Sequence, residues 1–196
     1  MAGESPTDFL KRGAGNRRSF FRTTVGRLAE ELAKHAESRV VQQRLLRPPG
    51  ALDEVSFVAA CTRCGECIQA CPVSALLKAP SSTGFAVGTP YIDPQVQGCV
   101  ACPEMPCAAA CPTTALTVPE TGWAGLKLAT LELNPDRCIA FHGSQCGVCA
   151  DACPIGEAAL TIDEGGRPVI RPEGCVGCGA CIRACVTSPS SLKLRY

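Results

Sequence analysis

Sixteen cysteines, divided into four sets of four, constrain this chain more than any other feature. In each set the fourth cysteine follows the third at i+4. No cysteine falls outside the sets, which are Cys61, Cys64, Cys67 and Cys71; Cys99, Cys102, Cys107 and Cys111; Cys138, Cys146, Cys149 and Cys153; and Cys175, Cys178, Cys181 and Cys185. Such a chain is expected to fold around whatever these thiols bind.

The spacing predicts four 4Fe-4S clusters, with the sixteen cysteines as their ligands. Three thiolates on a short loop can reach three corners of one iron-sulfur cube. The third and fourth cysteines lie one helical turn apart, so their side chains leave the same face and reach two neighbouring cubes. Pro72, Pro112 and Pro154 follow the first three sets and restrict the backbone there, whereas Val186 follows the fourth. The substitution removes a geometric cue but no ligand.

Zinc and disulfides are the alternative uses of so many cysteines. Structural zinc sites gather two separated pairs of Cys or His, whereas each set here adds two more cysteines immediately downstream. A disulfide scaffold requires an oxidising compartment, and residues 1–50 contain no cleavable secretory signal. The pattern therefore favours clusters, and zinc is the main alternative.

The chain is predicted to divide into residues 1–50, a basic tail and amphipathic helix, and residues 51–196, a four-cluster polyferredoxin domain. After each cysteine set comes a short alternating stretch interrupted by Gly and Pro, a pattern typical of small hairpins. The repeated unit is a cluster loop, one helical turn and a hairpin. Four copies predict an α+β fold built from two ferredoxin-like halves.

Two features of residues 1–50 suggest contact with another surface. A basic run contains no acidic residue and comprises Lys11, Arg12, Arg17, Arg18, Arg22 and Arg27. An apolar stripe at helical spacing follows, formed by Phe21, Val25, Leu28, Leu32, Ala36 and Val40. The stripe is suited to packing on the cluster domain, on a partner subunit or peripherally on a membrane surface. Nucleic acid is not expected, because no aromatic platform or binding motif accompanies the charge.

No catalytic residue is predicted. With four cysteines for each cluster, every iron has a protein ligand and no coordination site is open to a substrate. The two histidines are His35, in the expected helix, and His142, in the long loop of the third set. We interpret His142 as a candidate hydrogen-bond donor near a cluster sulfur. The predicted chemistry is one-electron transfer by a protein without its own substrate site.

The cysteine spacing resembles that of the ferredoxin-type NapG/MauM family, with the NapF type as a close relative. The resemblance covers about residues 57–186. Its most specific elements are the four residues, including Pro106, between Cys102 and Cys107, and the seven residues between Cys138 and Cys146. More broadly, the chain is similar to the four-cluster beta subunits of molybdopterin oxidoreductases.

The resemblance implies electron transfer between a quinone-linked membrane component or soluble donor and a catalytic redox subunit, of molybdopterin type or similar. An accessory role in maturing a metalloenzyme, as for the NapF type, is the alternative. The molybdopterin-enzyme subunits also favour a nested pairing over a tandem one, with the first set paired to the fourth and the second to the third. Cys185 would then join Cys61, and Cys111 would join Cys138. The segments EVSFVA and SLKLRY would pair as strands.

The chain is predicted to be cytoplasmic, with any membrane association through a partner. Arg17 and Arg18 resemble a twin-arginine export motif. The stretch that follows carries charges where an apolar region is needed, at Arg27, Glu30, Glu31 and Lys34. NapF-type relatives likewise keep a twin arginine and stay in the cytoplasm.

Overall fold

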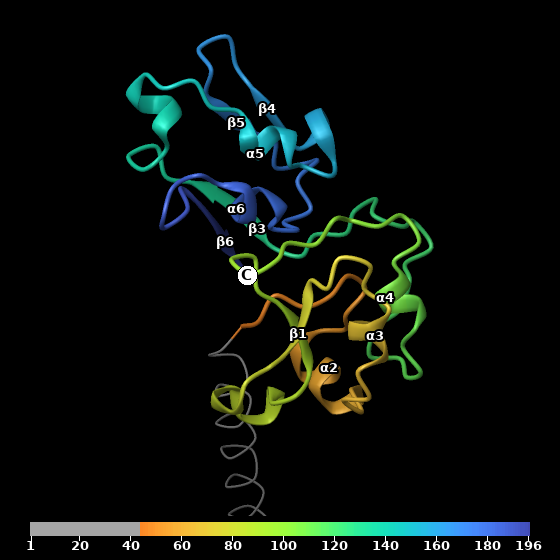
Figure 1. Cartoon of the computed structure of the whole chain (residues 1–196). Coiled ribbons are helices and arrows are strands. Elements are labelled where there is room, and N and C mark those ends of the chain that lie inside the picture. Colours follow the sequence, from red (N-terminus) through yellow and green to blue (C-terminus); the bar gives the residue numbers. More distant parts are fainter. Residues whose placement is uncertain (1–43) are drawn as a thin grey trace, which may run out of the picture. The chain divides into compact units, whose positions relative to one another are not determined.

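The computed structural model describes residues 44–196, so the basic run, the apolar stripe and His35 lie outside the described residues. Short elements dominate (Figure 1). The helices are α2 (Glu54–Ala60), α3 (Glu66–Gln69), α4 (Pro106–Ala109), α5 (Val148–Asp151) and α6 (Ala180–Ala184), with 3-10 turns η1 (Ser81–Ala86), η2 (Ile139–His142) and η3 (Gly156–Ala158). The strands are β1 (Leu76–Lys78), β2 (Pro90–Ile92), β3 (Thr130–Leu133), β4 (Leu160–Ile162), β5 (Pro168–Ile170) and β6 (Leu192–Arg195). No helix among these residues is both long and apolar enough to cross a bilayer.

The strands form three antiparallel pairs. Strand β1 pairs with β2, and β4 with β5, which confirms the hairpins predicted after the first and third cysteine sets. The stretch after the second set forms no hairpin of its own. Its strand β3 pairs instead with β6, in the register Leu131 opposite Leu194. The stretches after the second and fourth sets therefore pair with each other.

The segment EVSFVA, predicted to pair as a strand with SLKLRY, is helical, and that prediction is wrong. The Asp53 side chain accepts a hydrogen bond from the Ser56 backbone N–H at 3.2 Å and caps α2 at its N-terminus. Phe57 is the one fully buried residue of α2, so the segment presents a helical face rather than an alternating one. Strand β6, which lies in SLKLRY, has β3 as its neighbour.

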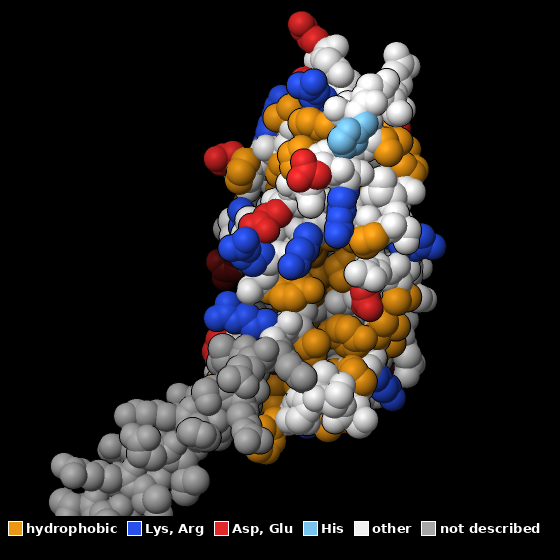
Figure 2. Space-filling model, turned by 90° about the vertical axis from the view of Figure 1, so that its left-hand side faces the viewer, with side chains coloured by type: hydrophobic (Ala, Val, Ile, Leu, Met, Phe, Trp, Pro, Cys, Tyr) orange, Lys and Arg blue, Asp and Glu red, His pale blue; other side chains and the backbone are white. Residues whose placement is uncertain are grey.

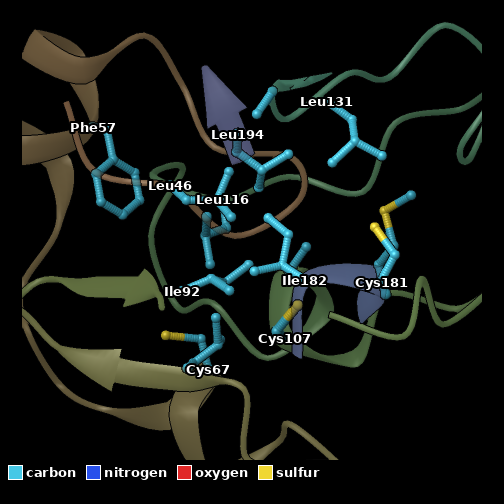
Figure 3. Close-up of a cluster of buried hydrophobic side chains, with 14 of the residues drawn as sticks. Leu46, Phe57, Cys67, Ile92, Cys107, Leu116, Leu131, Cys181, Ile182 and Leu194 are labelled. Atoms are coloured by element: carbon cyan, nitrogen blue, oxygen red, sulfur yellow. The ribbon is translucent and has the colours of Figure 1, made fainter. Parts of the chain in front are cut away.

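A single apolar cluster underlies both repeats (Figure 3). Its residues from the first half include Leu46, Phe57, Ile92 and Leu116. Those from the second half include Ile182 and Leu194. Several cysteines belong to the same cluster, including Cys67, Cys107 and Cys181. The metal-binding loops are thus continuous with the hydrophobic core rather than attached to its surface.

Arg47 fixes the start of the described chain to the first repeat. Its guanidinium is nearly buried and forms an ion pair with Glu54, with Nε 2.8 Å from Oε2. Its Nη1 donates to Thr89 Oγ1 at 2.9 Å and to the Pro90 carbonyl at 2.8 Å. The guanidinium carbon lies 4.6 Å from the centroid of the Phe57 ring. The residues before α2 are therefore part of the packed structure.

Candidate metal centres

Each cysteine set is arranged around one short helix, as the spacing predicts. The third cysteine lies on the helix and the fourth lies at or just beyond its end. In the first set, Cys67 lies in α3, and Gly65 at its N-terminus adopts φ +88°. Such a conformation suits glycine, which lacks the Cβ that would clash there. The same arrangement places Cys107 on α4, Cys149 on α5 and Cys181 on α6.

The sixteen cysteines line four cavities, four to each. We name them site I (Cys61, Cys64, Cys67 and Cys111), site II (Cys71, Cys99, Cys102 and Cys107), site III (Cys138, Cys146, Cys149 and Cys185) and site IV (Cys153, Cys175, Cys178 and Cys181). The empty space in them is about 370, 350, 330 and 320 Å³ respectively. Their similar size and identical ligand set indicate four sites of one kind.

The sites show that the cysteine sets pair in tandem, so the nested pairing predicted from the resemblance is wrong. Cys111 lies with Cys61 rather than with Cys138, and Cys185 lies with Cys138 rather than with Cys61. Likewise Cys71 lies in site II and Cys153 in site IV. The physical reason is local: α3 contacts α4, and α5 contacts α6, so each helix directs its last cysteine to the neighbouring loop of its own half.

The donor set fits 4Fe-4S clusters. Each site offers four sulfur atoms distributed around a cavity, and thiolate sulfur is the usual ligand of such clusters. Within residues 44–196, no three His, Cys, Asp or Glu side chains are gathered as a site for one metal ion would require. The arrangement therefore suits a group of atoms with several binding corners.

Burial raises the pKa of several cysteine thiols. Loss of solvation, reinforced by neighbouring cysteines, raises the pKa of Cys67, Cys99 and Cys107 to about 11. The same causes raise the pKa of Cys178 to about 12. These side chains can become thiolates at neutral pH only when metal charge compensates them. Assembly of the sites is therefore expected to release protons.

Two fourth-position cysteines behave in the opposite way. Burial alone would raise the pKa of Cys185, but hydrogen bonds from Ser190, Ser191 and Thr187 outweigh it and lower the pKa to about 6. At Cys111, burial is likewise outweighed, by hydrogen bonds from Thr113 and nearby backbone N–H groups, and the pKa is lowered. Hydroxyl groups that follow the fourth cysteine thus stabilise its thiolate.

Among residues 44–196, His142 forms no hydrogen bond with a cysteine sulfur. Its Nε2 lies 3.0 Å from the Asp136 backbone carbonyl in the long loop of the third set, and its side chain is exposed. A hydrogen bond from His142 to a sulfur of the cluster itself stays a prediction. The ring links two ends of the loop that carries Cys138.

Trp123 and the hydroxyl residues after the fourth cysteines were not predicted from the sequence. Trp123 lines site II, and its Nε1 donates a hydrogen bond to the Cys102 carbonyl at 2.8 Å. The single tryptophan, which lies between Gly122 and Gly125, could have indicated this role, because a large aromatic side chain in a loop usually packs over a buried site. Thr113 and Thr187, each two residues beyond a fourth cysteine, were another.

Sites II and IV adjoin each other where the two halves meet. The Cys99 backbone N–H donates to the Cys178 carbonyl at 2.9 Å, and Cys99 forms a parallel bridge with Gly179. A Cβ on Gly98 would lie 2.5 Å from the Ala180 nitrogen, so only glycine permits this approach. Sites I and II share one half and sites III and IV the other. The sites therefore adjoin in the order I, II, IV, III.

Comparison with known proteins agrees with this division. The family model for a 4Fe-4S dicluster domain matches residues 60–115, and a second such model matches residues 130–186. Two dicluster domains give four 4Fe-4S clusters. No solved structure gives a significant match to the chain.

Curated relatives cover most of the chain. The methylamine utilization ferredoxin-type protein MauM of Paracoccus denitrificans is 37% identical over 163 residues, which cover 79% of this chain and 72% of the relative. The ferredoxin-type protein NapG of Escherichia coli is 35% identical over 197 residues, covering 91% of this chain and 84% of the relative. The ferredoxin-type protein NapF of Escherichia coli is 30% identical and covers 73% of this chain. The chain therefore belongs to the NapG/MauM family of ferredoxin-type proteins, iron-sulfur proteins of electron transfer.

Proposed function

We propose that this chain is a non-catalytic relay that carries single electrons between a donor and the catalytic redox subunit of a larger complex. The sixteen cysteines hold the four clusters, with the membership of sites I to IV given above. When bound, the clusters supply the one-electron chemistry. The protein keeps them in fixed order and largely away from water.

The observation that carries the proposal is the contact between Cys99 and Cys178. The hydrogen bond of 2.9 Å brings site II against site IV, and the bond from Arg183 Nε to the Val96 carbonyl, also 2.9 Å, joins the same two halves. Sites I and III then lie at the two ends of the order. A carrier with two distinct ends is suited to joining two partners.

Both end sites have apolar side chains at the surface. Arg63 donates hydrogen bonds to the carbonyls of Phe85 and Val87, at 2.9 and 2.8 Å, and so holds that loop beside site I. Phe85 is 64% exposed. At site III, the lining residues Val148 and Val186 are also exposed. Figure 2 shows one face of the molecule on which hydrophobic side chains reach the surface between Lys and Arg side chains. These regions are suited to transient docking of a donor and an acceptor.

The experiment is anaerobic purification of the tagged full-length chain from its own host, followed by identification of the bound proteins. We expect a stable complex with a catalytic redox subunit, of molybdopterin type or similar, or with a quinone-linked membrane subunit. The second candidate is the accessory role in maturing a metalloenzyme, which the resemblance to the NapF type implies. Recovery of only an immature apoenzyme, bound transiently, would support that role and contradict the relay.

We place the protein in the cytoplasm. A reporter fused behind residues 1–50 is expected to remain there, because Arg27, Glu30, Glu31 and Lys34 interrupt the apolar region that export requires. Reporter activity in the periplasm that is lost when Arg17 and Arg18 are changed to lysine would show the opposite.

A further inference from the structure

The fourth cysteine set ends differently from the other three. Where the others have proline, Cys185 is followed by Val186, and then by a segment rich in hydroxyl side chains. We call residues 187–191, with the sequence TSPSS, the hydroxyl loop. Cys185 belongs to site III, so the loop lies at one end of the order of sites.

Two hydroxyl groups of the loop contact the Cys185 sulfur. Thr187 Oγ1 lies 3.2 Å from Sγ, and Ser191 Oγ lies 3.4 Å from it. Thr187 Oγ1 already accepts a hydrogen bond from the Ser191 backbone N–H at 3.0 Å, so its own hydrogen is free to point at the sulfur. Ser191 is only 4% exposed, and within residues 44–196 its hydroxyl has the Cys185 sulfur as its hydrogen-bond partner. Both hydroxyls are therefore placed to donate to a thiolate.

The equivalent cysteines of the other sites have fewer contacts of this kind. The sulfur of Cys71 in site II accepts one backbone N–H bond, from Ala75 at 3.3 Å, and the sulfur of Cys99 in the same site accepts one from Ala101 at 3.4 Å; neither has a hydroxyl donor among residues 44–196. The sulfur of Cys111 in site I has one hydroxyl neighbour, Thr113 Oγ1 at 3.5 Å. For Cys153 in site IV, the described residues provide no hydrogen bond to the sulfur. Two short hydroxyl contacts thus distinguish site III.

We propose that Thr187 and Ser191 give site III the highest reduction potential of the four sites. Reduction adds one electron and no proton, so the negative charge on the site grows by one. A donor hydrogen bond to a ligand sulfur stabilises that added charge and makes reduction easier. One consequence rests on the proposed relay. Electrons collect at site III, and the acceptor docks there, against the exposed side chains of Val148 and Val186.

Solvent exposure is the effect that opposes this ranking. Cys64 of site I is the one exposed cysteine among the sixteen, and nearby water also stabilises a reduced site. Water is a mobile donor, whereas the hydroxyls at site III are fixed by the backbone bond to Ser191 and by burial. We therefore rank site III above site I, and a titration can decide between them.

The test is a redox titration of the full-length protein with all clusters bound, followed by electron paramagnetic resonance under anaerobic conditions. Ser191→Ala and Thr187→Val each remove one donor. Each is expected to lower the ratio of reduced to oxidised site III, at a fixed potential, about tenfold, equivalent to ~59 mV for one electron. Thr187→Ser keeps the hydroxyl and is expected to titrate like the wild type. Thr113→Val is the matched control, because it removes a hydroxyl from site I and is expected to move a different, lower step.

The proposal fails if Ser191→Ala leaves all four steps unchanged, or if the step that it moves is not the highest. Thr187→Val also loses the acceptor for the Ser191 N–H, so Ser191→Ala carries the test if Thr187→Val does not retain its iron. The titration needs no partner. If the redox steps have the expected order but the protein delivers no electrons to any partner, the proposed relay is wrong and the ranking of the sites still holds.

Discussion

At the scale of single residues, exposure separates one ligand from the other fifteen. Cys64 is exposed, whereas Cys67, Cys178 and Cys181 are buried. An exposed cluster ligand meets oxygen and reagents first, since attack on a thiolate requires access. The exposed ligand makes site I, at one end of the order of sites, more open to oxidation. It also shortens the distance between site I and a docked partner.

We therefore predict that site I is the first to lose its cluster in air. When the holo-protein is exposed to air in the presence of iodoacetamide, Cys64 is expected to be alkylated first, and Cys181 of site IV among the last. Peptide mass spectrometry over time measures the order. Simultaneous labelling of Cys64 and Cys181 would mean that exposure does not control cluster loss.

Two arginine–carboxylate pairs offer a second test at this scale. Arg47 and Glu54 are 9% and 17% exposed, whereas Arg195 and Glu132 are 74% and 42% exposed. Removing one member of a buried pair leaves an uncompensated charge. Arg47→Ala is expected to lower the free energy of unfolding by about 3 kcal/mol. The matched Arg195→Ala is expected to lower it by less than ~1 kcal/mol.

Thermal melts followed by visible absorption compare the two variants. Loss of cluster absorption at a clearly lower temperature is expected for Arg47→Ala only. Equal melting temperatures would show that the residues before α2 contribute little to the cluster domain.

At the scale of elements, local rules predicted more than long-range ones. The position of one short helix in each cysteine set follows from the i+4 spacing of Cys67 and Cys71 and its repeats, which a single turn satisfies. The β1–β2 and β4–β5 hairpins follow from alternation around turn residues. The pairing of β3 with β6 could not be predicted, because about 60 residues separate them and alternation does not specify a distant partner.

The sites show the same limit. Spacing predicted the sixteen cysteines as ligands, but the chain resembles proteins with nested sets, and the resemblance suggested the wrong pairing. The contact of α3 with α4 determines the site in which Cys111 lies. A single sequence does not show which helices pack together, so this pairing could not be predicted. Thr187 and Ser191 were missed because hydroxyl residues are common in loops, and their role depends on a side-chain direction set by the tertiary fold.

The junction between the halves yields a prediction at this scale. Gly98→Ala places a methyl group 2.5 Å from the Ala180 nitrogen and is expected to break the Cys99–Cys178 hydrogen bond. In the fully reduced protein, the magnetic interaction between sites II and IV should weaken while iron content is retained. Electron paramagnetic resonance measures the interaction. Gly165→Ala is the control, because its Cβ would meet only the Asp163 side chain, at 3.2 Å, far from the junction between the halves. An unchanged interaction in Gly98→Ala would contradict the order of sites.

At the scale of the whole molecule, four metal sites and one apolar cluster share the interior of residues 44–196. Cysteine ligands belong to the apolar core, so binding of the iron-sulfur clusters and formation of the core are expected to be coupled. The chain without iron is expected to lose much of its packed structure. All sixteen ligands and Arg47, with its partners, lie in this part of the chain, and none lies before it.

The last prediction follows from that distribution. A chain that begins at Gln43 keeps every ligand and the Arg47–Glu54 pair, and is expected to retain about sixteen iron and sixteen acid-labile sulfide per chain. It lacks the basic run and the apolar stripe, so it should bind its redox partner or an anionic membrane more weakly. Iron and sulfide analysis, together with sedimentation of full-length and shortened chains with anionic vesicles or the purified partner, measures both. Loss of visible absorption in the shortened chain would place the first 42 residues in the cluster domain. Unchanged binding to both surfaces would remove the docking role from them.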